Sequence, residues 1–298
     1  MKKTIRHCLY VSLLMLLPLW TACDKDIHEN DRHGLAVGME WLEGIEPTDI
    51  TSPVNLWIYD AEGHEVEAHE FSSPQELASG LFSLPEGDYT LVGVCGLTEP
   101  FRYEYENGTR TADMLRVSLA DPSASPAHAV GGVAVASVTD TGVNLRSVIR
   151  VAPLLAELAV RIDGVPEGAS LAVTVRNAAT CLYPARRGDD NSYVVPSAEK
   201  TDALLPQAVA DGGTLSTDAR LMPTAQGETC TLLYMVMTFA DGSRHEYTAE
   251  APLMLAGKRY ELALEYDRMQ PYMYITATDI NPWGEGWITS DDIFNPGI

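Results

Sequence analysis

Short segments in which apolar and polar residues alternate recur along most of this chain. Between positions 35 and 42, Leu35, Val37, Met39 and Trp41 fall on one face of an extended segment, and residues 54–59 follow after a loop that contains proline. Segments of this length, bounded by Gly, Pro, Asn and Asp, are typical of β-strands. The pattern therefore predicts an all-β fold.

Turn residues predict two hairpins. Residues 60–63 (Asp-Ala-Glu-Gly) join the strand 54–59 to the strand 64–71. Asn107 and Gly108 lie in the middle of residues 103–111, at the two positions where a type I′ turn needs positive φ. Later apolar segments continue the series of strands: 130–138, 148–151, 158–162, 171–175 and 231–239.

One arrangement of segments occurs twice. Residues 59–66 followed by 84–91 resemble residues 239–247 followed by 255–262: each is a hairpin with an acidic-Gly turn, and then a Gly-x-x-Tyr-x-Leu strand or a near variant. Two similar sandwiches in tandem would produce this repeat, and so would chance similarity among hairpins. We predict two tandem β-sandwich domains: an N-terminal domain over residues 34–142 and a C-terminal domain over residues 143–298, whose tail starts at about residue 271.

The N-terminus has the composition of an export signal. Lys2, Lys3 and Arg6 precede an apolar run over residues 9–20, which is short for a membrane span and ends in small residues before Cys23. We predict a signal peptide over residues 1–22. The alternative for Cys23 is an incidental cysteine in an ordinary secreted protein.

The junction at Cys23 resembles the bacterial lipobox, in which a small residue precedes a cysteine that takes a diacylglyceryl group. Trp20 stands where that family usually has Leu. The resemblance implies that Cys23 is the lipid attachment site and that the lipid, palmitate included, holds the protein on a membrane.

Residues 23–33 form a polar tether without any apolar period. Acidic residues directly after the cysteine, Asp24 and Asp26, resemble the signal that sends lipoproteins of the Bacteroidetes to the cell surface. This resemblance implies an outer-membrane, lipid-anchored protein that faces the cell exterior. The general polarity of tethers explains the composition equally well.

Charge and cysteine content exclude several classes of function. The formal net charge is −22, and removal of the signal peptide makes it more negative, so nucleic acid and anionic membrane surfaces are poor partners. Cys95, Cys181 and Cys230 are too widely spaced for a disulfide framework or a zinc site. The sequence leaves open whether Cys181 and Cys230 form a disulfide or stay free.

No motif in the chain indicates an enzyme. Residues 64–69 (His-Glu-Val-Glu-Ala-His) depart by one residue from the zinc-binding His-Glu-x-x-His helix motif and lie on a predicted strand, where Glu65, Glu67 and His69 share a face. A solvated hairpin edge explains them more simply. We predict no catalytic site, no metal site and no cofactor, because nucleophile-elbow, P-loop and dinucleotide motifs are also absent.

Several of these features together resemble the fimbrillin-type lipoproteins of Bacteroidales, particularly their anchor and accessory subunits. They are the lipobox, the two sandwiches with Gly-x-x-Tyr-x-Leu strands, an opening segment 145–150 for the second domain and a closing segment 274–283. The resemblance covers nearly the whole chain after the signal peptide. It implies transthyretin-like, Greek-key sandwiches, a role in fimbrium (pilus) assembly or cell adhesion, fimbrial subunits as partners and no active site.

The end of the chain is predicted to form a final strand over residues 272–280, followed by Pro and Gly that prevent a regular continuation. Such a strand either completes its own domain or pairs with an open edge on another subunit. The resemblance implies strand exchange between subunits, which makes this strand a candidate subunit contact through Tyr272, Tyr274, Thr276, Thr278 and Ile280.

A glycan-binding surface lipoprotein of a polysaccharide-uptake system is the alternative function. Such a protein would share the anchor, the acidity and the sandwiches, and it would stack sugars on exposed aromatic rings. The candidates are Trp57 and Tyr59 on one strand and Trp283 and Trp287 in the tail. Large aromatic residues on strands also belong to cores, which is the competing interpretation.

Overall fold

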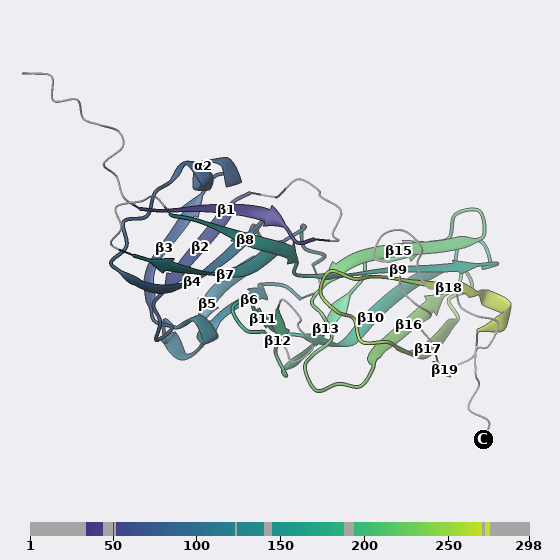
Figure 1. Cartoon of the computed structure of the whole chain (residues 1–298). Coiled ribbons are helices and arrows are strands. Elements are labelled where there is room, and N and C mark those ends of the chain that lie inside the picture. Colours follow the sequence, from purple (N-terminus) through teal and green to yellow (C-terminus); the bar gives the residue numbers. More distant parts are fainter. Residues whose placement is uncertain are drawn as a thin grey trace, which may run out of the picture.

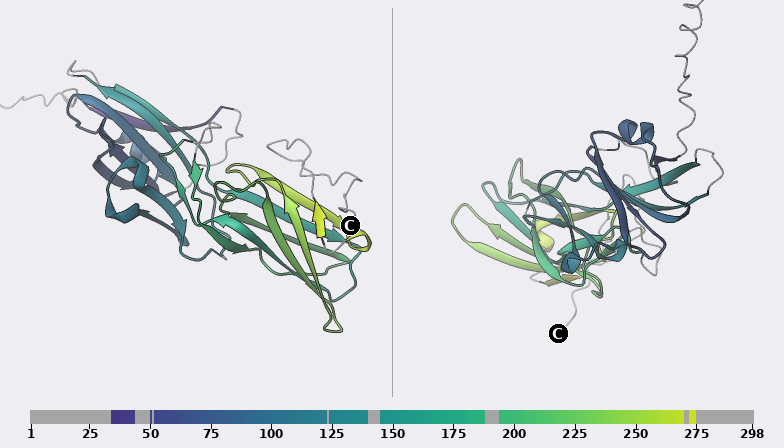
Figure 2. Two further views of the ribbon diagram at one scale, coloured as in Figure 1. Left: turned by 90° about the horizontal axis from the view of Figure 1, so that it is seen from below. Right: turned by 90° about the vertical axis from the view of Figure 1, so that its left-hand side faces the viewer.

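The computed structural model of this protein describes residues 34–43, 50, 52–122, 124–139, 145–187, 194–269 and 272–274. These residues are mostly strands, with one short helix, α2 (Pro74–Ser79), and the 3₁₀ turns η2 (Glu106–Gly108), η3 (Ala112–Met114) and η4 (Tyr266–Arg268). The strands form two groups, which follow one another along the long axis of the molecule (Figures 1 and 2). The predicted all-β class is confirmed.

The first sandwich is built around a six-stranded sheet. Its strands lie in the order β1 (Leu35–Trp41), β8 (Leu145–Pro153), β7 (Val130–Val138), β4 (Gly87–Cys95), β2 (Val54–Tyr59) and β3 (Glu65–Phe71). Strands β1 and β8 run parallel, whereas the pairs from β8 to β3 are antiparallel.

This sheet is folded, so that β1 and β8 lie over one face of the other strands. Leu35 of β1 and Ile149 of β8 pack in one cluster with Leu56 of β2. Trp57 and Tyr59 point to the opposite face of β2 and belong to a different cluster. Every residue of β2 is therefore buried, because side chains alternate between faces and both faces are covered.

A four-stranded sheet covers that opposite face. Its order is β12 (Val195–Pro196), β11 (Cys181–Tyr183), β6 (Leu115–Leu119) and β5 (Phe101–Tyr105). Leu115, Val117 and Leu182 pack in the same cluster as Trp57 and Tyr59. The chain thus returns from the second sandwich to supply β11 and β12 to the first.

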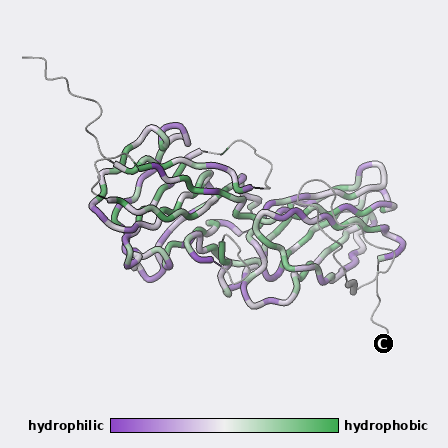
Figure 3. The backbone as a smooth tube through the Cα atoms, in the orientation of Figure 1, coloured by the Kyte–Doolittle hydropathy of each residue, from purple (hydrophilic) through white to green (hydrophobic). Residues whose placement is uncertain are grey.

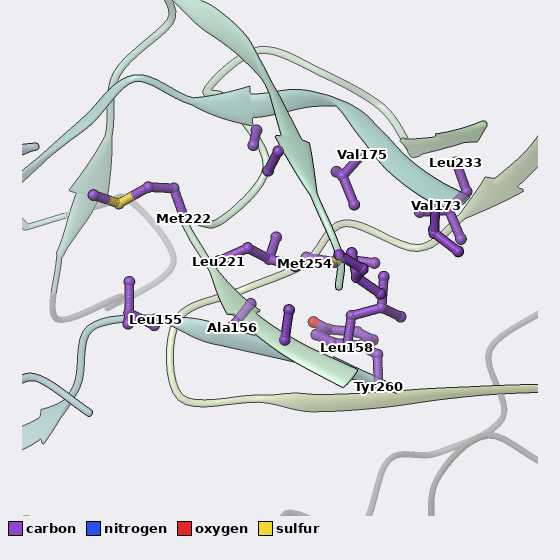
Figure 4. Packing of buried hydrophobic residues seen from close by; sticks show 14 of the residues in the cluster. Leu155, Ala156, Leu158, Val173, Val175, Leu221, Met222, Leu233, Met254 and Tyr260 are labelled. Carbon is purple, nitrogen blue, oxygen red and sulfur yellow. The ribbon is translucent and has the colours of Figure 1, made fainter. Parts of the chain in front are cut away.

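The second sandwich has two facing sheets. One has the order β13 (Lys200–Leu204), β10 (Ser170–Ala179), β16 (Thr231–Thr238), β17 (Arg244–Ala251) and β19 (Tyr272–Tyr274), with β14 (Ala208–Val209) beside β10; the other has the order β15 (Thr214–Leu221), β9 (Ala156–Asp163) and β18 (Arg259–Glu265). Alternate residues of β9 and β16 are buried between the sheets. Figure 3 shows where hydrophobic residues lie along the chain, and Figure 4 shows the packing around Leu158, Val173, Leu233 and Tyr260.

The sheets do not divide at residue 142, the domain boundary predicted from the sequence. Residues 145–150 were expected to open the second domain, but they belong to β8, which pairs with β1 along seven residue pairs. Ile149 and Val151 of β8 are fully buried in the first sandwich. The change from the first to the second sandwich comes between β8 and β9, and β11 with β12 crosses back afterwards.

The two predicted turns have different outcomes. The turn at residues 60–63 joins β2 to β3 as expected, with Gly63 at φ 82° and the Asp60 side chain accepting from the His64 N–H at 2.7 Å. Asn107 and Gly108 do adopt positive φ (55° and 71°). The tight hairpin predicted around them is wrong, because β5 pairs with residues 115–119 across a longer connection.

The repeated segments form similar hairpins but differ afterwards. Strand β4 returns to pair antiparallel with β2 in the sheet of its own hairpin. Strand β18 follows the hairpin β16–β17 but pairs parallel with β9 in the facing sheet. The feature that both sandwiches share is instead a parallel pair between an early and a late strand, β1 with β8 and β9 with β18.

Candidate functional site

Sheet edges are the candidate sites of a protein that assembles through strands, because an edge strand has unpaired backbone groups. Strand β3 is one edge of the large sheet and is strongly charged. Its Glu67 accepts from His69 at 2.8 Å, and its Glu65 accepts from Arg110 at 2.7 Å. Charged side chains on an edge disfavour the addition of another strand, so β3 is a protected edge.

Strand β1 is the opposite edge of that sheet and is apolar. Leu35 and Val37 are each 1% exposed, because they pack into the core beneath β8 and helix α2. Among the described residues, the outer side of β1 makes one bridge, between Leu35 and Phe82. The side chains of β1 therefore belong to the core, while most of its outer backbone edge carries no strand within the described chain.

Strand β19 lies at the edge of the large sheet of the second sandwich. Tyr272, Met273 and Tyr274 pair parallel with Thr248, Ala249 and Glu250 of β17 in three residue pairs, compared with eight between β16 and β17. The predicted final strand thus starts within its own domain. Its remaining candidate contacts, Thr276, Thr278 and Ile280, lie outside the described residues.

The aromatic residues proposed for sugar stacking on β2 are not at the surface. Trp57 is 3% exposed and meets the edge of the Tyr103 ring at 5.1 Å between centroids. Tyr59 is fully buried. Their burial between the two sheets of the first sandwich removes them as a stacking platform, and Trp283 and Trp287 lie outside the described residues.

A polar network joins the two sheets of the first sandwich beside Tyr59. The hydroxyl groups of Tyr59 and Tyr105 are 3.0 Å apart, and Tyr105 also donates to the Glu65 carboxylate, which accepts from Arg110. Burial raises the pKa of Tyr59 and of Tyr105 above the ordinary range of a phenol. Both hydroxyls therefore stay protonated and available as donors, so the network is structural.

The cysteines of the described chain are free thiols. Cys95 and Cys181 are buried and Cys230 is partly exposed. Burial raises the pKa of the Cys95 thiol to about 12, which makes it a poor nucleophile at neutral pH. Cys23, the candidate lipid attachment site, lies outside the described residues.

Within the described ranges, no three residues among His, Cys, Asp and Glu gather closely enough to hold a metal ion. The same part of the chain contains no helix that is both long and apolar enough to span a membrane.

Two interlocked β-sandwiches, with apolar and weakly held edge strands, define this protein as an all-β sandwich protein. The chain belongs to the family of fimbrillin-A associated anchor proteins Mfa1 and Mfa2, whose model matches residues 31–289. None of the curated proteins compared with this chain matches it in sequence.

Solved structures share the fold at low sequence identity. A candidate adhesin from Bacteroides ovatus is 14% identical with a TM-score of 0.54, covering 80% of this chain and 93% of its own. The fimbrial anchor protein Mfa2 from Porphyromonas gingivalis is 13% identical with a TM-score of 0.51, covering 71% and 80%. A candidate polysaccharide-binding protein from Bacteroides thetaiotaomicron is 13% identical with a TM-score of 0.51, covering 87% and 94%.

Proposed function

We propose that this protein is a non-enzymatic, cell-surface fimbrial anchor or accessory subunit that acts in fimbrial assembly and adhesion. The observation that carries the proposal is the match of residues 31–289 to the fimbrillin-associated anchor family. The adhesin fold of its structural neighbours supports the same role. The hydroxyls of Tyr59 and Tyr105 and the Glu65 carboxylate bond to one another or to Arg110, and the Cys95 and Cys181 thiols are buried, which supports a role without catalysis.

The anchor in this proposal is a lipid on Cys23 that holds the protein in the outer membrane, facing the exterior. The residues between Cys23 and Leu35 span at most about 40 Å when fully extended, so the first sandwich would stay close to the membrane. Strand β1 lies in the first sandwich and β19 on the far side of the second (Figure 1). The two ends of the molecule would then serve different tasks, attachment and contact with fimbrial subunits.

The subunit contact in this proposal is the edge formed by β17 and β19. Three residue pairs hold β19, so its displacement costs fewer hydrogen bonds than that of any fully paired strand of the same sheet. A strand from a fimbrial subunit could replace it, or β19 and the residues after it could add to a subunit's open edge, since main-chain hydrogen bonds do not depend on which chain supplies them.

Two truncations test this contact. One ends after Met269 and removes β19, and its matched control ends after Tyr274 and keeps β19. Loss of fimbrial-subunit binding by the first truncation, with the thermal transition of the second sandwich preserved, supports strand exchange. Unfolding of the second sandwich in that variant would mean that β19 is an integral strand, and the exchange proposal would fail.

The glycan-binding alternative is weakened because Trp57 and Tyr59 are buried. Its support is the fold of one structural neighbour with a polysaccharide-binding name, at 13% identity. Fluorescence quenching of the tryptophans with and without oligosaccharides tests whether Trp283 and Trp287 take that role.

A further inference from the structure

A hollow of about 670 Å³ lies where segments of the two sandwiches meet. Arg186 and Arg187, which follow β11, line one side, and Val195 of β12 lies in its wall. Gln226 comes from the loop between β15 and β16 of the second sandwich, and its N–H donates to the Ser197 carbonyl at 3.0 Å. That hydrogen bond holds the two segments together, so the hollow has a fixed frame.

Arg186 is held in place by three contacts. Its guanidinium lies 3.5 Å from the centre of the Tyr183 ring, and its Nε donates to the Asp113 carbonyl oxygen at 2.8 Å. Its Nη2 is 3.7 Å from the Glu106 carboxylate, which also accepts from the Tyr183 hydroxyl at 3.2 Å. The charge of Arg186 is therefore balanced by Glu106, which does not line the hollow.

Arg187 is different, because it is exposed and forms no ion pair with any described residue. Among the described residues that line the hollow, only Asp113 has a carboxylate, and its backbone carbonyl already accepts from Arg186. The hollow thus offers one cation without a fixed partner, one acceptor carboxylate and the amide of Gln226.

The rest of the lining is apolar and comes from Met114, Ala185 and Val195. We propose that this hollow binds a uronic-acid residue of an acidic oligosaccharide. The sugar carboxylate pairs with Arg187, hydroxyl groups donate to Asp113 and bond to Gln226, and the C–H face of the ring packs on Met114 and Val195. A ligand with one carboxylate among many hydroxyls fits this mixed lining better than an acidic peptide, whose further carboxylates would face Asp113.

Calorimetric titration of the purified protein with trigalacturonate tests the proposal, with the neutral trisaccharide galactotriose and the peptide triglutamate as comparison ligands. We expect trigalacturonate to bind and the two comparison ligands to bind at least tenfold more weakly. The variant R187Q should weaken trigalacturonate binding about tenfold, since a hydrogen bond to a charged group is lost. The matched control R146Q changes another exposed arginine, at the start of β8, and should leave binding unchanged.

Three results would overturn the proposal: no binding of trigalacturonate, equal binding by R187Q and the unaltered protein, or triglutamate binding as tightly as trigalacturonate. Because Arg187 is exposed, R187Q should keep the melting temperature of the unaltered protein, and a thermal scan of each variant checks this. The outcome does not depend on the fimbrial role, which the truncations described above test separately.

Discussion

The carbonyl oxygen of Arg150 on β8 lies 2.0 Å from the position that a β-carbon on Gly132 of β7 would occupy. The two strands pair only at Val130 and Gly131, and from Gly132 onward their hydrogen-bonded ladder stops. The absence of a side chain at Gly132 lets the backbone of β8 cross closely over β7. This close approach is what folds β1 and β8 back over the face of β2 and β4.

The variant G132A should therefore destabilise the protein by about 1–3 kcal/mol or more, because the obstructing atom is backbone and cannot turn aside. Urea unfolding gives the free energy. The control is G38A on β1, whose added β-carbon would meet nothing nearer than the Arg146 side chain at 3.7 Å. Equal stability of the two variants would contradict the proposed role of Gly132.

Removal of the Tyr105 hydroxyl tests the network that joins the sheets of the first sandwich. The variant Y105F leaves the Glu65 carboxylate and the Tyr59 hydroxyl without their shared partner, and we expect a loss of about 1–3 kcal/mol in the free energy of unfolding. The matched control is Y103F on the same strand, because Tyr103 is 46% exposed. It should change stability by less than about 0.5 kcal/mol; a similar loss in both variants would refute the assignment.

The same two tyrosines make stability depend on pH in the alkaline range. Burial raises the pKa of Tyr59 and Tyr105 in the folded state above the value of about 10 in the unfolded chain. The unfolded state then releases protons first, so their contribution is complete below pH 10 and is lost as the pH rises above it. Unfolding free energies measured between pH 8 and 11 should fall less steeply in the double variant Y59F/Y105F, and an unchanged slope would contradict this account.

The local elements could be predicted from the sequence because their signals are local. The hairpin β2–β3 needs only the alternating strands and the turn from Asp60 to Gly63, and both are continuous in the chain. The assignment of β8 to the first sandwich could not be predicted in this way. It depends on parallel pairing with β1, from Leu35 with Leu145 onward, and no adjacent turn specifies such a long-range pair.

The burial of Trp57 and Tyr59 did have a signal in the sequence. Residues 54–59 are apolar apart from Asn55, and a nearly continuous apolar run is typical of a strand covered on both faces. The hollow beside Arg187 had a weaker signal in the sequence, which is the pair of adjacent arginines, Arg186 and Arg187, in an acidic chain. Asp113, Met114 and Gln226 of its lining are distant from these arginines in the sequence, and only the folded chain brings them together.

The anchoring role is tested most directly in the bacterium that encodes this protein, by replacing Cys23 with alanine and measuring the fraction of fimbriae in the culture medium. If the lipid on Cys23 holds this subunit to the membrane and this subunit holds the fimbria, most fimbriae should be shed while the variant protein stays folded and bound to them. Fimbriae that remain on the cells to the same extent as with the unaltered protein would contradict the account.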